Sequence, residues 1–274
     1  TPYMKNLLDK VGVEMQVVRV GTFKSAVEPY ILSEMSDANR EQQEHYLGSL
    51  WAVLSKEMAE SRKIDSETFN QLTDSVMLTM STQELIQNKI VDHLCYRSEM
   101  EDKLRRLADV EMKDELTPKL VTPSQMILTD SNKKTNDDKQ IVVVYATGEI
   151  DASSSVPSMG EDGIHSESLA ATIRKLQYDE NVKGMVLRVN SPGGSAFGSE
   201  VIWKAIEDFK KSGKPVAVSM SDLAASGGYY ISSGAQRIFA EPTTITGSIG
   251  IFGMIPNASN LVNNTLGVKF EEVT

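Results

Sequence analysis

Ser226 occurs in a setting that is typical of a nucleophilic serine. It stands between Ala225 and Gly227 in the segment SDLAASGGYYISSGA, after the apolar run PVAVSM and before a helical pattern. Small neighbours permit the strained strand-to-helix turn that exposes a hydroxyl for attack on a carbonyl carbon. The more common role of a serine at such a place is to cap the helix. Chemistry at Ser226 therefore needs a general base and a site for an oxyanion.

A glycine turn that could hold an oxyanion precedes Ser226 in the chain. Gly193 and Gly194 follow the apolar run GMVLRV and the residues NSP, and a helical pattern begins soon after them. Glycines at such a place let backbone N–H groups approach a ligand closely. The segment has neither the Lys-Ser/Thr pair of a P-loop nor the glycine order of a dinucleotide site, which favours an oxyanion over a nucleotide. A plain tight turn is the alternative.

Histidine, the usual base for a serine nucleophile, is not placed in the order that α/β-hydrolases use. His45, His93 and His165 all precede Ser226, whereas that order has the histidine after the serine. No two of the histidines have the spacing of metal ligands, and Cys95 stands alone. We therefore expect neither a histidine base in this order nor a metal site.

Lys24 is a second candidate for the base. It lies in the segment VRVGTFKSAVEPY, where its neighbours are largely apolar and the first acid is Glu28. A lysine titrates near pH ~10.4 when free, so poising it near neutral pH needs a shift of about three units, which only burial can supply here. A surface lysine is the alternative. Sequence spacing alone cannot show that Lys24 meets Ser226.

The elements expected around these residues change character along the chain. A short helix, a turn at Gly12, a strand near 13–18 and a helix over 36–61 begin it. Two capping boxes, Ser81 with Glu84 and Ser98 with Glu101, predict further helix starts. Beyond residue 140 the pattern predicts strands at 141–145, 184–189, 215–220 and 237–240 and helices at 166–178 and 199–212. This alternation indicates an α/β fold with βαβ units and a largely parallel sheet.

Composition excludes several classes of protein. The 274 residues carry a net charge of −10, which argues against sequence-independent binding of nucleic acid. No run reaches the roughly 18 to 20 apolar residues that span a bilayer. The last residues, LGVKFEEVT, read as a strand, so we expect a piece of a longer protein. Segment 7–18 resembles segment 262–273, as a cut through a tandem duplication would produce.

Four motifs in the same order resemble the signal peptide peptidase A (protease IV) family of membrane-anchored bacterial serine peptidases. They are RVGTFKSAVEPY, LRVNSPGGSAFGSE, AASGGYYIS and TGSIGIFG. The resemblance implies the long form of the family, in which two tandem repeats share a ClpP/crotonase-like fold. Residues 1–128 would then be the mostly helical C-terminal part of the first repeat, carrying the lysine. Residues 129–140 would be a linker, and 141–274 would be the second repeat, carrying the serine and the oxyanion hole.

The resemblance also implies the roles of the site residues. Ser226 would be the nucleophile, Lys24 the general base and Ser248, in TGSIG, the hydroxyl that orients the lysine amine. The amides of Gly194 and Gly227 would form the oxyanion hole, with Gly193 shaping the turn. We also expect Phe23, Met254 or Ile255 to line an apolar substrate pocket.

The family implies an ATP-independent endopeptidase without a cofactor that degrades the apolar remnants of cleaved signal peptides. It further implies a homo-oligomer, a tetramer in the family, on the outer side of the bacterial cytoplasmic membrane, held by an anchor outside this chain. Two alternatives remain open. A crotonase-like acyl-CoA enzyme would use a carboxylate such as Glu167 or Glu200. A catalytically inactive peptide-binding scaffold would hold Ser226 and Lys24 far apart.

Overall fold

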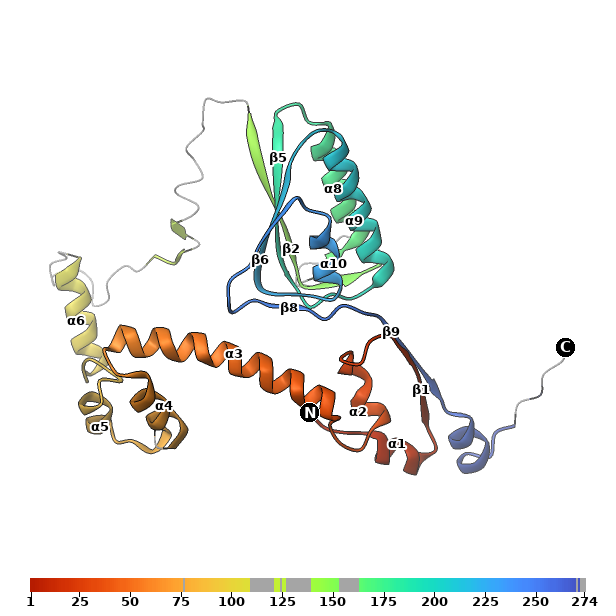
Figure 1. The fold of residues 1–274 in the computed structure, drawn as a ribbon, viewed down its shortest axis with the longest axis horizontal. Coiled ribbons are helices and arrows are strands. Elements are labelled where there is room, and N and C mark those ends of the chain that lie inside the picture. Colours follow the sequence, from red (N-terminus) through yellow and green to blue (C-terminus); the bar gives the residue numbers. More distant parts are fainter. Residues whose placement is uncertain are drawn as a thin grey trace. The chain divides into compact units, whose positions relative to one another are not determined.

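The computed structural model describes residues 1–75, 77–108, 121–123, 125–126, 139–152, 163–269 and 271 (Figure 1). The chain divides into two compact units, one formed by Thr1–Leu50 with Lys139–Thr274 and the other by Trp51–Asp138. The first 50 residues thus belong to the same unit as the segment that carries Ser226. Most of the expected linker 129–140 lies outside the described residues, and the division into two repeats stays a prediction.

A parallel sheet forms the centre of the first unit. Its strands run in the order β2 (Gln140–Thr147), β5 (Val182–Ser191), β6 (Val216–Ala225) and β7 (Arg237–Phe239), and β8 (Ile245–Gly247) also pairs with β6. All of these pairs are parallel. The α/β class, the βαβ units and the largely parallel sheet are therefore confirmed.

Two helices cover one face of this sheet. Helices α8 (Ser166–Tyr178) and α9 (Ala196–Lys211) lie side by side along it (Figure 1). Their buried side chains include Ile173, Ile206 and Phe209, which join Leu187 and Val218 of the strands in one hydrophobic core. Each fully buried side chain of this kind contributes about 1.5–3 kcal/mol, so this layer gives the strand ends a rigid support.

The strand before Ser226 is longer than its apolar pattern indicates. The sequence predicts an end at Met220, but β6 continues through Ser221 and Asp222 to Ala225. Pairing explains the difference, because Leu223–Ala225 form a parallel ladder with β8. Helix α10 (Gly227–Ser233) follows directly, so Ser226 occupies the single residue between strand and helix.

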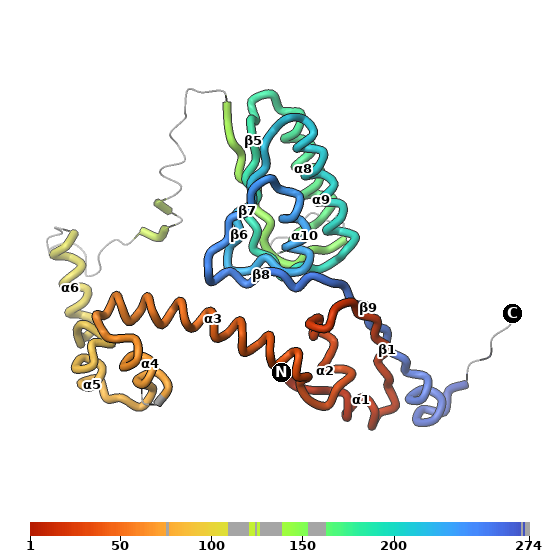
Figure 2. The backbone as a smooth tube through the Cα atoms, viewed as in Figure 1, coloured from red at the N-terminus to blue at the C-terminus, as the bar shows by residue number. Residues whose placement is uncertain are grey.

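A two-stranded ribbon joins the two segments of the first unit, Thr1–Leu50 and Lys139–Thr274. Strand β1 (Glu14–Arg19) pairs antiparallel with β9 (Phe252–Asn257), and the tube in Figure 2 shows them side by side. Just beyond the ladder, the Val20 amide donates to the Ile251 carbonyl at 3.0 Å. The ribbon thereby brings the loop after β1 beside the loop before β9.

The other elements of the first unit are short, except α3, which continues into the second unit. They are α1 (Lys5–Val11), η1 (Ser25–Val27), α2 (Glu28–Ile31), the first part of α3 (Asp37–Arg62), the parallel pair β3 (Glu149–Asp151) and β4 (Gly163–His165), and the π-helix η3 (Leu261–Thr265). Gly12 and Gly267, which match in the suspected repeat, both have left-handed backbones with φ of 80° and 71°. Residues 270, 272 and 273 of that repeat lie outside the described residues.

The second unit is helical where it is described. It contains the end of α3, α4 (Ser66–Ser75), η2 (Met77–Thr79), α5 (Thr82–Gln87) and α6 (Arg97–Leu107). The capping box of Ser81 and Glu84 is confirmed. The box of Ser98 with Glu101 is wrong, because α6 begins at Arg97 and the Glu99 carboxylate accepts from the Tyr96 amide at 2.7 Å. Ser98 therefore lies inside the first turn.

No helix in the described ranges is both long enough and apolar enough to cross a membrane.

Candidate active site

Ser226 sits on a strained turn between β6 and α10. Its φ of 53° and ψ of −116° are unusual for a residue with a side chain, and such a backbone costs on the order of 1–3 kcal/mol. The Ser226 amide donates to the Gly247 carbonyl at 2.8 Å, which holds the turn against the end of β8. Ser226 occupies the N-cap position of α10, yet its side chain makes no capping hydrogen bond. The hydroxyl is thus left for other contacts.

Strand register places Ser248 beside Ser226. Ala225 of β6 is paired with Gly247 of β8 in a parallel ladder, and the two serines are the next residues in each segment. Ser248 also has a left-handed backbone, with a φ of 51°. Two strained serines therefore stand together at one edge of the sheet.

Lys24 reaches both serines from a distant part of the sequence. Its Nζ atom lies 3.1 Å from Ser226 Oγ, 3.0 Å from Ser248 Oγ and 2.8 Å from the Ser248 carbonyl oxygen. The Lys24 residue is only 7 % exposed, although lysine is among the residues most often found at the surface. The structure thus brings together the three residues that the sequence analysis proposed as catalytic.

Burial sets the protonation behaviour of Lys24. Desolvation of the ammonium lowers the pKa of Lys24 from its ordinary value of 10.5, because a charged amine loses its hydration when it is removed from water. The three oxygen atoms around Nζ are hydroxyls and a carbonyl rather than carboxylates. Burial therefore shifts the amine toward its neutral, basic form.

The glycine turn packs tightly against the Ser226 turn. A Cβ atom on Gly193 would lie 2.5 Å from the Gly227 nitrogen, and one on Gly194 would lie 2.1 Å from the Ile150 carbonyl oxygen. Both distances are shorter than any real carbon contact, so only glycine fits at either position. Gly193 and Gly194 also have positive φ values of 101° and 144°.

The direction of the amides in this turn follows from its hydrogen bonds. Ile150 donates to the Gly193 carbonyl and accepts from the Ser195 amide, each at 2.7 Å. In the trans peptide between Gly193 and Gly194, the N–H points opposite to the carbonyl. Because the Gly193 carbonyl points at Ile150, the Gly194 amide is directed away from Ile150. The Gly227 amide belongs to the first residue of α10, where a helix offers no internal acceptor. The Gly193 amide, in contrast, donates to Ser191 Oγ at 3.1 Å.

A cavity of about 1190 Å³ opens in front of these groups. Phe23 lines it, as expected, but Met254 and Ile255 do not. These two residues lie further along β9 than Phe252, where they pair with Val17 and Gln16 of β1. Sequence reasoning missed further lining residues with large apolar or aromatic side chains. They come from α3 and from the segment around β8 and β9 and include Tyr46, Leu50, Ile245, Ile249 and Phe252.

The carboxylates considered for acyl-CoA chemistry lie elsewhere. Glu167 is on the first turn of α8, and Glu200 on α9 accepts a hydrogen bond from the Tyr230 hydroxyl. Neither of them borders the cavity that contains Ser226. The short distance between Lys24 and Ser226 also differs from what the inactive-scaffold alternative predicts. Within the described ranges, no three His, Cys, Asp or Glu side chains are grouped so that they could hold a metal ion.

Comparison with known proteins gives matches along nearly the whole chain. The family model described as "Peptidase family S49" matches residues 1–111 and 208–274. Protease 4 of Haemophilus influenzae and Protease 4 of Salmonella typhi are each 36 % identical over 99 % of this chain. The chloroplastic serine protease SPPA of Arabidopsis thaliana is 31 % identical over 91 % of it.

The chain spans 44 % of the length of each Protease 4 and 36 % of the Arabidopsis protein. These matches agree with the resemblance carried by the four sequence motifs. The chain belongs to peptidase family S49.

Proposed function

We propose that this chain carries the catalytic centre of a serine endopeptidase that uses Ser226 as nucleophile and Lys24 as general base. The observation that carries the proposal is the 3.1 Å distance between Lys24 Nζ and Ser226 Oγ, with a lysine that is buried and a serine that does not cap its helix. A general base must lie within hydrogen-bond reach of the proton that it removes.

The reaction proceeds through an acyl-enzyme. Neutral Lys24 takes the hydroxyl proton as Ser226 Oγ bonds to the carbonyl carbon of the scissile peptide, and the carbonyl oxygen becomes an oxyanion. The lysine ammonium then gives its proton to the leaving amine as the C–N bond breaks. A water molecule, deprotonated by the same amine, then attacks the acyl carbon. The bond between this carbon and Ser226 Oγ breaks, the lysine ammonium returns the proton to Oγ, and the second product leaves as a carboxylic acid.

Ser248 orients the lysine amine in this scheme. A neutral amine has two N–H donors and one lone pair. The Ser248 hydroxyl and carbonyl oxygen, at 3.0 and 2.8 Å, accept the two donors. The lone pair is then directed at the remaining neighbour, the Ser226 hydroxyl.

The amides of Gly194 and Gly227 stabilise the oxyanion. The proposal is supported by the direction of the Gly194 amide away from Ile150 and by the position of Gly227 at the first residue of α10. Such donors act mainly in the transition state, where the negative charge develops, and they lower the barrier to acylation.

The substrate is an extended peptide with apolar side chains. Phe23, Ile249 and Phe252 line the cavity and suit such groups. The resemblance to signal peptide peptidase A further supports remnants of cleaved signal peptides as the substrates. It also supports a membrane-anchored homo-oligomer on the outer side of the bacterial cytoplasmic membrane.

Covalent labelling tests the proposal. We expect a fluorophosphonate to modify the intact protein at Ser226, as mass spectrometry of the peptide that contains Ser226 would show. Hydrolysis of a fluorogenic apolar peptide should be lost at the same rate as Ser226 becomes labelled. Ser221, on the same strand, is the internal control and is expected to remain unlabelled. Hydrolysis that continues after complete labelling, or labelling at another serine, would contradict the assignment.

The activity is also expected to depend on pH through Lys24. Only the neutral amine can accept the serine proton, and the neutral fraction grows as pH rises through the pKa of Lys24. Because burial lowers this pKa, kcat/KM should rise through an ionisation below 10.5. Measurement of kcat/KM against pH checks this expectation. A rise centred at or above the ordinary lysine value would mean that the amine is not desolvated.

A further inference from the structure

The loop that carries Lys24 is tied to a buried carboxylate. Glu28, in the first turn of α2, has no exposed surface although its side chain ends in a charged group. Carboxylates are almost never fully buried unless other groups satisfy them. Glu28 follows Lys24 closely in the chain but does not contact its amine, so the proposed catalytic reaction does not account for its burial.

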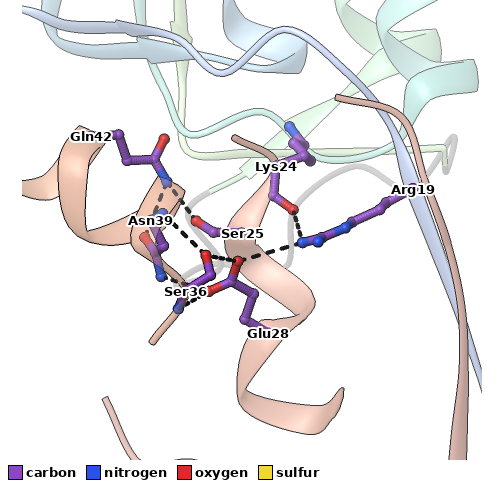
Figure 3. Close-up of polar contacts among 7 residues, drawn as sticks. All are labelled: Arg19, Lys24, Ser25, Glu28, Ser36, Asn39 and Gln42. Atoms are coloured by element: carbon purple, nitrogen blue, oxygen red, sulfur yellow. Dashed lines mark hydrogen bonds and ion pairs between the residues drawn. The ribbon is translucent and has the colours of Figure 1, made fainter. Parts of the chain in front are cut away.

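Hydrogen bonds satisfy Glu28. The Ser36 hydroxyl donates to Oε1 at 2.6 Å, and Asn39 Nδ2 donates to Oε2 at 3.1 Å (Figure 3). The Ser36 amide adds a longer contact of 3.4 Å. Burial by itself raises the pKa of Glu28, but the bonds from Ser36 and Asn39 together with Arg19 outweigh it and lower the pKa below its ordinary value. The carboxylate is therefore ionised at neutral pH.

Arg19 links this carboxylate to the backbone of Lys24. Its Nη1 atom lies 3.5 Å from Glu28 Oε1 and 3.3 Å from the Lys24 carbonyl oxygen, as the dashed lines in Figure 3 show. Arg19 is the last residue of β1 and is paired with Phe252 of β9, so its backbone is fixed by the ribbon. Nη1 of Arg19, at the start of the loop, thus contacts both the Glu28 carboxylate and the backbone of Lys24.

The loop needs such support because few backbone bonds hold it. It contains Gly21, whose φ is 96°, and the Lys24 amide makes a 3.3 Å bond to the Gly21 carbonyl. A second side-chain contact lies just beyond, where Gln42 Nε2 donates to Ser25 Oγ at 2.7 Å. The Lys24 amine is at the end of a four-carbon chain, so a rotation of its peptide would displace Nζ from Ser226.

We propose that Arg19 and Glu28 are positioning residues for the general base. Glu28, held by Ser36 and Asn39, orients the Arg19 guanidinium, and Arg19 fixes the Lys24 carbonyl so that the amine stays between Ser226 and Ser248. The inference rests on the proposed Ser226–Lys24 function. Misplacement of a reacting group by about 1 Å can cost about 10²-fold in rate, so these residues act on catalysis without touching the substrate.

The test compares variants of the intact protein. Arg19→Ala is expected to lower kcat about 10- to 100-fold while KM changes less than about twofold. Arg19→Lys, which keeps a cation able to donate to both oxygens, should lie between Arg19→Ala and the unchanged protein. Arg62→Ala is the matched control. Arg62 forms an ion pair with Asp92, and its side chain is 35 % exposed against 32 % for Arg19.

Glu28→Gln tests whether the charge of the Glu28 carboxylate orients Arg19. The amide keeps the shape of the side chain but removes the charge that attracts Arg19, so kcat should fall in the same direction. The double variant Arg19→Ala with Glu28→Gln should be no slower than the slower single variant, because both changes remove one shared contact. If Glu28→Gln does not fold, the partly exposed Arg19 variants still decide the question.

A second readout does not depend on peptidase activity. The pH dependence of Lys24 modification by an amine-reactive reagent, followed by mass spectrometry, reports the titration of its amine. In Arg19→Ala this titration should move toward that of an ordinary lysine, since a displaced amine regains water, whereas in Arg62→Ala it should not move. A residue that only stabilised the fold would change melting but leave this titration in place.

The outcomes separate the two proposals. The positioning role is overturned if Arg19→Ala keeps kcat and the Lys24 titration unchanged, or if kcat falls only in proportion to the folded fraction. The proposed function fails instead if Lys24→Met keeps full activity or if Ser226 is not labelled. In that case a shifted Lys24 titration in Arg19→Ala would still establish the positioning of the loop.

Discussion

Replacement of Lys24 by methionine is expected to lower kcat about 10²- to 10⁴-fold, the range that a positioned general base contributes. Methionine is unbranched and adapts to buried sites, so the cavity wall should keep its shape. The variant also removes an amine whose burial opposes its charged form. We therefore expect the melting temperature to stay near that of the unchanged protein while the hydrolysis of an apolar peptide is nearly lost.

Lys210→Met is the matched control for this change. Lys210 is also partly buried and hydrogen-bonded, to Glu207 and to the Gly234 carbonyl, but it lies on α9 and does not border the cavity. Its replacement should leave the kinetics unchanged. Retention of more than about a tenth of the activity by a folded Lys24→Met protein would remove Lys24 from the role of base, since even a modest general base contributes more than this.

Sequence periodicity predicted the central part of the fold well. Strands β2, β5, β6 and β7 and helices α8 and α9 all occur near the expected positions. The apolar runs of β5, β6, α8 and α9 supply most of the buried core, and their burial against one another follows from those runs, whereas β7 is a short strand of three exposed residues. The turn around Ser226 was also visible in sequence, because its small residues lie between a strand and a helix.

The contact between Lys24 and Ser226 could not be predicted from the hydrophobic periodicity or the motifs of either segment. The two residues are 202 positions apart, and they are joined through the ladder of β1 with β9 and the ladder of β6 with β8. Both β8 and β9 come from the glycine-rich segment ITGSIGIFGMIPN, residues 245–257. Apolar and polar residues do not alternate regularly in this segment. Only the family resemblance supplied this link before the structure did.

The positioning residues left a weaker signal in the sequence. Glu28 reads as the first acid after Lys24, and Arg19 reads as a polar residue just after the strand expected near 13–18. What distinguishes them is burial of the Glu28 carboxylate and the path of the loop between them. Both are properties of packing between segments rather than of periodicity.

Replacement of Gly194 by alanine is expected to lower kcat about 10²- to 10³-fold, the usual effect of losing one oxyanion donor. An added Cβ would lie 2.1 Å from the Ile150 carbonyl oxygen, so the turn must move. That movement carries the Gly194 amide away from the oxyanion. Because the amide acts mainly on the transition state, KM for an apolar peptide should change far less than kcat.

Gly213→Ala separates this effect from backbone strain alone. Gly213 also has a positive φ, of 83°, but nothing lies within 4 Å of an added Cβ. The positive φ should cost about 1–2 kcal/mol of stability at either position, and the contact with Ile150 adds a further cost at Gly194 only. If kcat per folded molecule falls in Gly194→Ala but not in Gly213→Ala, the loss belongs to the oxyanion donor. Equal kinetics for the two variants would mean that the Gly194 amide takes no part in the reaction.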